Sequence, residues 1–199
     1  MHISNFCIQN YYNNLLFGAN KLSSGNVIKK INNDGTEEEL YTDFIEFDKN
    51  NPNDKKLFED IYNNTEPCSD DDLINFIAYD FSISTRPCSK EHFYALSKPQ
   101  TNYDKVENSN ILGFVKTIDD KEEDALFIDC IQSKDNCRYD NKKRIYKKVG
   151  NTMLDCITEQ TERDIELFSL PGVIPFYTNY GFKLIDSNTN LMRLKRNNK

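Results

Sequence analysis

Hydrophobic positions along the chain recur with two periods, and the change between them predicts where helices and strands lie. Apolar residues fall three or four positions apart in residues 51–64 and 69–81, as on the buried face of a helix. Strands are predicted where apolar and polar residues alternate, in 41–48, 92–97, 110–117 and 124–133. Turn-prone segments join the last three strands, which predicts an antiparallel meander.

The C-terminal third mixes both element types. A helix is predicted from residue 149, where one face of the pattern is apolar, and a buried strand follows at 165–170. Residues 171–182 predict a short helix closed by Gly181, before two final strands. The order is strand, two helices, three strands, helix, strand, helix, two strands. This order indicates a mixed α+β fold with a mostly antiparallel central sheet flanked by helices.

Residues 1–40 are predicted to be an N-terminal extension that adds strands or a hairpin, ahead of a domain of residues 41–199. The run "NVIKKINNDGTEEEL" has strand-like segments on both sides of Asn33-Asp34-Gly35. Asp-Gly favours a tight hairpin turn because both residues accept a positive φ.

Charge narrows the classes of partner. The net charge is −7, which disfavours general nucleic-acid binding and suits a cationic or amine-bearing substrate. No apolar run is long enough to span a bilayer, and the N-terminus "MHISNFCIQNYYNN" lacks the pattern of a secretory signal. We therefore expect a cytoplasmic protein that does not bind membranes.

The six cysteines indicate neither a metal site nor a disulfide framework. No C-x-x-C pair occurs, and only His2 and His92 could join the cysteines as soft ligands. Reduced thiols that pack as small apolar residues are the expected state.

The segment "RIYKKVGNTMLDCI" could bind an anion where its helix begins. The first turn of a helix has unpaired N–H groups and the positive end of the dipole, and glycine lets a phosphate approach. The candidate donors are the backbone amides of Val149, Gly150, Asn151 and Thr152. Positive charge would come from Arg144, Lys147 and Lys148. The alternative is an ordinary amphipathic helix with a solvated lysine pair.

Two motifs and the element order resemble the GNAT superfamily of N-acetyltransferases. The element order agrees over residues 41–195, and the motifs agree over 125–182. In that family the fourth strand splays from the fifth, pantetheine lies in the gap, and a Q/R-x-x-G-x-G/A turn holds the pyrophosphate. Gly150 matches the final small position of that turn, whereas Lys148 replaces the earlier glycine and Ile145 the leading Q/R. The run "FYTNYGF" matches the signature F-Y-x-x-x-G-F without a gap.

The resemblance implies roles for residues of both motifs. Tyr177 would protonate the departing CoA thiolate as general acid, with a core aromatic as the alternative. Phe176 would contact the cofactor, as would Ile131 and Ser133 of the fourth strand, and the backbone N–H near Ile131 would stabilise the oxyanion. From the residues alone, Asp129 within an apolar run is a candidate base, with a strand aspartate in an ion pair as the equal alternative.

The predicted function is therefore transfer of an acetyl group from acetyl-CoA to a primary amine, by direct attack through a tetrahedral intermediate and without a metal. The acceptor would be a small molecule or a peptide amine. The resemblance also allows a homodimer, since many proteins of this fold pair through their last strands. There are two alternatives. One is a catalytically degenerate binding module, which Lys148 in the glycine position favours. The other is a toxin-type aminoacyl-tRNA acetyltransferase.

Overall fold

A single nine-stranded sheet organises the chain. The computed structural model describes residues 18–64, 73–83, 91–119, 123–134 and 145–196. The strand order across the sheet is β6-β1-β2-β3-β4-β5-β7-β9-β8. The strands are β1 (Asn20–Ile31), β2 (Glu37–Phe47), β3 (Glu91–Ser97), β4 (Ile111–Ile118), β5 (Ala125–Ser133), β6 (Tyr146–Lys147), β7 (Asp164–Phe168), β8 (Lys183–Asp186) and β9 (Leu191–Leu194).

All neighbouring strands pair antiparallel except β5 and β7, which are parallel. A parallel pair needs a crossover connection, and helix α4 (Val149–Gln160) provides it. The predicted mixed fold with a mostly antiparallel sheet is confirmed, and so is the meander, formed by β3, β4 and β5.

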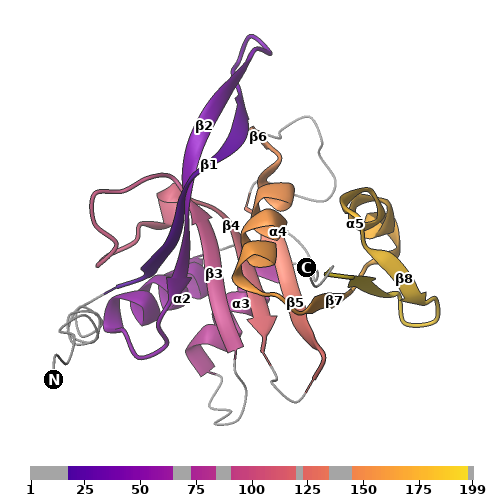
Figure 1. Cartoon of the computed structure of the whole chain (residues 1–199). Helices are drawn as coiled ribbons and strands as arrows, with labels where there is room; N and C mark the ends of the chain where they lie inside the picture. The colour runs from indigo at the N-terminus through magenta and orange to yellow at the C-terminus, as the bar shows by residue number, and fades with distance from the viewer. Residues whose placement is uncertain (1–17, 65–72, 84–90, 120–122, 135–144, 197–199) are drawn as a thin grey trace, which may run out of the picture.

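Helices cover both faces of the sheet, and each face has its own core (Figure 1). Helix α4 and the short helix α5 (Ile174–Tyr180) pack over the first core, which includes Phe44, Ile128 and Met153. Helices α2 (Pro52–Asn64) and α3 (Leu73–Ile83) pack over the second core, where Phe58 and Phe81 stack with ring centroids 4.0 Å apart. Two 3-10 turns complete the described elements, η2 (Asn108–Asn110) and η4 (Pro171–Val173).

The predicted elements are found within a few residues of their expected bounds. The helix expected over 69–81 is α3, although residues 69–72 lie outside the described part of the chain. The two-residue strand β6 was not predicted. It pairs with β1 at Lys29 and Lys30, beside the start of α4.

The expected hairpin joins β1 and β2 and extends well beyond the rest of the sheet (Figure 1). Gly35 has a φ of 84°, and its amide donates to the carbonyl of Asn32 at 2.9 Å. The positive φ explains the preference for glycine in this turn. The hairpin spans the boundary that the sequence analysis drew after residue 40. Among the described residues, no helix has the length and apolar character that crossing a membrane requires.

Candidate functional site

The site begins where β5 separates from β7. The parallel pairing joins Ala125 through Ile128 to β7, whereas β5 continues to Ser133. The register between β4 and β5 shifts at the same point: Lys116 lies opposite Cys130 and the next β4 residue opposite Ile128. Asp129 is therefore the extra residue of a β-bulge, which bends a strand and ends regular pairing. Beyond it, no described strand pairs with the β7 side of β5.

Backbone groups of β5 point toward this unpaired edge. The amide of Lys134 donates to the carbonyl of Leu112 in β4 at 2.9 Å. Successive residues of a strand direct their backbone groups to opposite edges. The N–H and C=O groups of Ile131 and Ser133 therefore point away from β4, toward the edge that β7 has left. Both residues that the resemblance selected thus offer main-chain groups to a ligand there.

The first turn of α4 is the second part of the site. The amide of Thr152 donates to the carbonyl of Lys148 at 2.9 Å, which is the first bond of the helix. Helix geometry therefore leaves the amides of Val149, Gly150 and Asn151 without an intrahelical acceptor. The expected donor set thus narrows to three amides, because that of Thr152 is engaged within the helix.

Lys148 has a left-handed backbone at the N-cap, with a φ of 67° and a ψ of 2°. This conformation favours glycine, so the geometry gives a physical reason for the glycine that the family pattern has there. The Lys148 side chain is exposed. Lys147 instead pairs with Glu37 of the hairpin, which also pairs with Lys29 at 3.1 Å. Arg144 lies outside the described residues.

Helix α5 supplies the aromatic side of the site. A Cβ atom at Gly150 would lie 3.1 Å from the ring of Phe176, so the two residues are in close contact. The ring of Phe176 lies 5.1 Å from that of Tyr177, in a T-shaped arrangement. Phe176 therefore covers the turn of α4, and its small partner Gly150 permits that contact.

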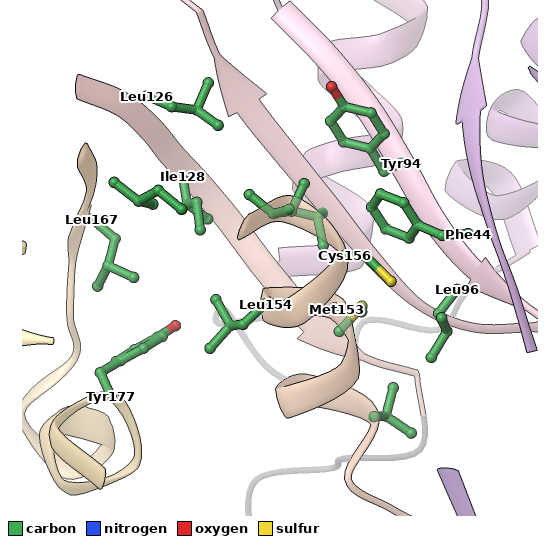
Figure 2. Close-up of a cluster of buried hydrophobic side chains, with 14 of the residues drawn as sticks. Phe44, Tyr94, Leu96, Leu126, Ile128, Met153, Leu154, Cys156, Leu167 and Tyr177 are labelled. Carbon is green, nitrogen blue, oxygen red and sulfur yellow. The ribbon is translucent and has the colours of Figure 1, made fainter. Parts of the chain in front are cut away.

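Tyr177 is buried between α5, α4 and β5, and Figure 2 shows its hydroxyl directed toward Leu154 of α4. Burial raises the pKa of Tyr177 to about 12, and the nearby Cys130 adds to this shift. The phenol is therefore protonated throughout the physiological pH range and can serve as a proton donor.

Asp129 faces the other side of the sheet. Its Oδ2 accepts a hydrogen bond from Lys116 Nζ at 2.8 Å, and Lys116 also pairs with Asp80 of α3 and with Glu91, the latter at 3.1 Å. Burial lowers the pKa of Lys116, but hydrogen bonds to Asp129 and Asp80 outweigh it and hold the pKa above its ordinary value. Lys116 is thus a permanent cation among three carboxylates.

Strict alternation along β5 predicts that Asp129 shares a face with Ile131, and this prediction is wrong. Ile131 packs against the first core, below α4, whereas the carboxylate of Asp129 lies on the α3 side. The bulge breaks the strict alternation on which that expectation rested. The ion pair with a neighbouring lysine, the second interpretation of the sequence, is present.

The remaining candidate ligands do not converge. His92 Nδ1 lies 2.6 Å from Glu46 Oε1, and its ring stacks on that of Tyr94. Cys130 and Cys156 are buried free thiols, and burial raises their pKa values to about 12 and about 11. Within the described residues, no group of three His, Cys, Asp or Glu side chains could hold a metal ion. The other cysteines and His2 lie outside these residues.

Sequence reasoning missed two contacts that shape the site. One is the packing of Phe176 on Gly150, for which the sequence offered only the two motifs separately. The other is a hydrogen bond between Tyr180 of α5 and Asp155 of α4, at 2.7 Å. The sequence analysis gave neither of these two residues a role.

No protein-family model matches this chain, and a search of curated proteins finds no match either. Tetrahymena GCN5 is similar in structure, with 12% identity and a TM-score of 0.47, over 86% of this chain and 97% of that one. An acyl-CoA N-acyltransferase from Pseudomonas aeruginosa has 11% identity and a TM-score of 0.41, over 70% and 82%. Nourseothricin acetyltransferase has 11% identity and a TM-score of 0.30, over 90% and 86%.

The resemblance to the GNAT superfamily is confirmed at the level of the fold by the chain's own topology. Apart from the two-residue β6 and the 3-10 turns, the order of elements from β2 to β9 is the expected one, and the fourth and fifth predicted strands of that series, β5 and β7, are parallel and then separate.

Proposed function

We propose that the protein is an acyl-CoA-dependent N-acetyltransferase that transfers an acetyl group directly to a primary amine. One observation carries the proposal. Three features lie on the same side of the sheet: the unpaired edge of β5 beyond β7, the first turn of α4 and the Tyr177 hydroxyl. This arrangement combines main-chain hydrogen-bonding groups, an anion-binding helix end and a proton donor.

The first turn of α4 would hold the pyrophosphate of acetyl-CoA. This role is supported by the three free amides of Val149, Gly150 and Asn151 and by the positive end of the helix dipole. Lys148 adds an exposed ammonium group next to them. A ligand anion there would replace the water that otherwise satisfies these donors, and Phe176 would shield the turn on one side.

The pantetheine would lie along the open edge of β5. Its amide groups resemble a peptide backbone, so they can pair with Ile131 and Ser133 as an added strand does. The N–H of Ile131 is the proposed donor to the oxyanion when the amine attacks the thioester carbonyl, which leaves the C=O of Ile131 to pair with the pantetheine. The backbone of β5 would thus both bind the arm and stabilise the negative charge.

Tyr177 would protonate the thiolate as the tetrahedral intermediate collapses. Its pKa of about 12 keeps the proton on the phenol until the thiolate forms nearby. Burial raises the pKa of a thiol as well, so the site shifts the pKa values of the Tyr177 phenol and of the CoA thiol in the same direction.

For Asp129, the ion pair with Lys116 supports a structural role more than that of general base. An Asp129→Asn substitution separates the two. If Asp129 is the general base, the variant should lose at least about 100-fold in kcat, and the loss should depend on pH. A structural partner of Lys116 would instead lower stability.

The acceptor is proposed to be cationic in its free form. Support comes from the net charge of −7 and from Asp80 and Asp129 beside the bulge, on the face opposite α4, where two carboxylates share the single positive charge of Lys116. Primary amines carry a positive charge at neutral pH, so carboxylates at this point would attract them before they lose a proton.

The test is calorimetric titration with acetyl-CoA, followed by an assay for free CoA with a panel of amines. Wild type is expected to bind in the micromolar range. Gly150→Val should lose binding, because its side chain would displace Phe176 and crowd the turn. Gly172→Val is the matched control, since no atom lies within 4 Å of its Cβ position.

Tyr177→Phe should bind acetyl-CoA as wild type does but release CoA at least about 100-fold more slowly. If wild type fails to bind acetyl-CoA, the non-catalytic binding module is the better description. If it binds but Tyr177→Phe retains full activity, the assignment of the general acid is wrong.

A further inference from the structure

We propose that the hydrogen bond between Tyr180 and Asp155 positions helix α5 so that Tyr177 reaches the reacting sulfur. Tyr180 and Asp155 are then positioning residues, and neither touches the substrate. This inference rests on the proposed function, since it concerns the placement of the proposed general acid.

Helix α5 depends on few contacts for its position. It has seven residues, and the side chains that pack against the first core come from positions 174, 176, 177 and 180. Phe176 meets Gly150 at the first turn of α4, and Tyr180 meets Asp155 more than one turn later. The two helices are thus joined near both ends of α5, with Tyr177 between the joints.

The direction of each hydrogen bond follows from the available donors. Tyr180 Oη donates to Asp155 Oδ1 at 2.7 Å. The hydroxyl of Thr158 donates to the carbonyl of Leu154 at 2.6 Å, so its proton is not available to Tyr180, which lies 3.3 Å away. The phenol–carboxylate bond is therefore the shorter of the two polar contacts that Tyr180 makes with α4, and the one in which Tyr180 donates its proton. A hydrogen bond to a charged group is stronger than one between neutral groups.

Tyr177 has no comparable anchor of its own. Among the described residues, no hydrogen bond holds its hydroxyl, and packing against Phe176 and Phe182 fixes only its ring. The place of the hydroxyl is consequently set by where α5 lies. A shift of about 1 Å in a reacting group can cost about 100-fold in rate.

The burial of Tyr180 and the charge of Asp155 both favour the hydrogen-bonded form. Burial raises the pKa of the Tyr180 phenol; the hydroxyl of Thr158 lowers it, but the hydrogen bond to Asp155 acts with burial and the pKa stays above its ordinary value. The proton therefore stays on the phenol at any pH used in an assay, and the bond persists over the whole range.

The test compares Tyr180→Phe, Asp155→Ala and Asp155→Asn in the full chain. The first two remove the bond, whereas Asp155→Asn keeps a carbonyl acceptor at the same place. We expect the first two to lower kcat by about 10- to 100-fold with the dissociation constant of acetyl-CoA within twofold of wild type. Asp155→Asn should restore most of kcat. The double variant Tyr180→Phe/Asp155→Ala should be no slower than either single variant.

Tyr41→Phe is the matched control, because this exposed tyrosine lies on β2, far from α5 in the sheet. It should leave kcat unchanged. Equal losses in kcat from Asp155→Asn and Asp155→Ala, or multiplied losses in the double variant, would overturn the proposal. So would a loss confined to the binding of acetyl-CoA.

Amide hydrogen exchange provides a readout that needs no activity. Exchange within residues 174–180 should rise at least about 10-fold in Tyr180→Phe and remain near wild type in Asp155→Asn, while α4 is unchanged. Unchanged exchange in Tyr180→Phe overturns the positioning role. If exchange rises in Tyr180→Phe but the wild type neither binds acetyl-CoA nor releases CoA, the Tyr180–Asp155 contact still holds α5 in place. In that case the proposed function is refuted instead.

Discussion

Replacing Asp54 by asparagine is expected to make the stability of the protein less sensitive to pH. Asp54 is 1% exposed in the first turn of α2. Its Oδ2 accepts the amide of Asp48 at 2.9 Å, and its Oδ1 is buried without a partner in the described structure. Burial, with the nearby charge of Asp48, raises the pKa of Asp54 from 3.8 to about 6.

The sign of this pH dependence follows from the number of protons that Asp54 binds in the folded and unfolded states. Between the unfolded and folded pKa values, the folded state holds a proton that the unfolded state has lost, so stability falls as pH rises. The full penalty, reached above the folded pKa, is about 3 kcal/mol at about 1.36 kcal/mol per pKa unit. About 0.6 kcal/mol of it is already present near pH 4, which leaves a change of about 2.4 kcal/mol between about pH 4 and pH 8.

Asparagine keeps the oxygen that accepts the Asp48 amide and has no charge. Its buried amide group can itself cost about 1–3 kcal/mol, but that cost does not depend on pH. The quantity to measure is therefore the difference in unfolding free energy between Asp54→Asn and wild type, from urea titrations at several pH values. It should rise by about 2.4 kcal/mol in favour of the variant from about pH 4 to pH 8.

Asp60→Asn, at an exposed position of the same helix, is the control and should show no such trend. A pH-independent difference for Asp54→Asn, or a change below about 1 kcal/mol, would refute the reasoning, because the raised pKa is its only source.

Three further perturbations follow from the geometry. Lys148→Gly should raise the unfolding free energy by about 1 kcal/mol in urea titrations, because it removes a left-handed non-glycine residue; unchanged or lower stability would argue against strain at this turn. Lys116→Met should cost about 3–5 kcal/mol, since it leaves its carboxylate partners without their buried cation; a loss below 1 kcal/mol would contradict that role. A hydrogen bond to Glu46 raises the pKa of His92, so its stabilising contribution is complete below pH 6.5 and is lost as pH rises through the folded value. His92→Gln should thus destabilise the protein at pH 5.5 more than at pH 8.5 in thermal melts, and the opposite trend would exclude this pairing.

The regular elements could be predicted because each repeats one pattern of apolar and polar side chains over many residues. The run of β5 and the apolar face of α4 each extend over enough residues for one period to dominate. The hairpin was visible because its turn requires a positive φ, which Gly35 accepts and few other residues do. In contrast, β6 has two residues, which is too short for any period to appear.

The candidate site was only partly predictable, for a physical reason in each case. The two motifs gave Gly150 and Tyr177, but their contact through Phe176 depends on how two helices pack. The face of Asp129 could not be predicted, since a single extra residue in β5 reverses the alternation after it. That Lys148 takes a left-handed backbone is also not encoded locally, because lysine has no preference for it.

The pairing of β6 with β1 ties the turn of α4 to the beginning of the chain. The amide of Ile31 donates to the carbonyl of Ile145 at 2.7 Å, just ahead of β6. During synthesis the hairpin emerges long before this partner, and its outer strand has unpaired backbone groups until β6 arrives. A fragment that starts at residue 41 would therefore lose the strand that holds β6 just ahead of the proposed phosphate site, even though it contains every residue of that turn.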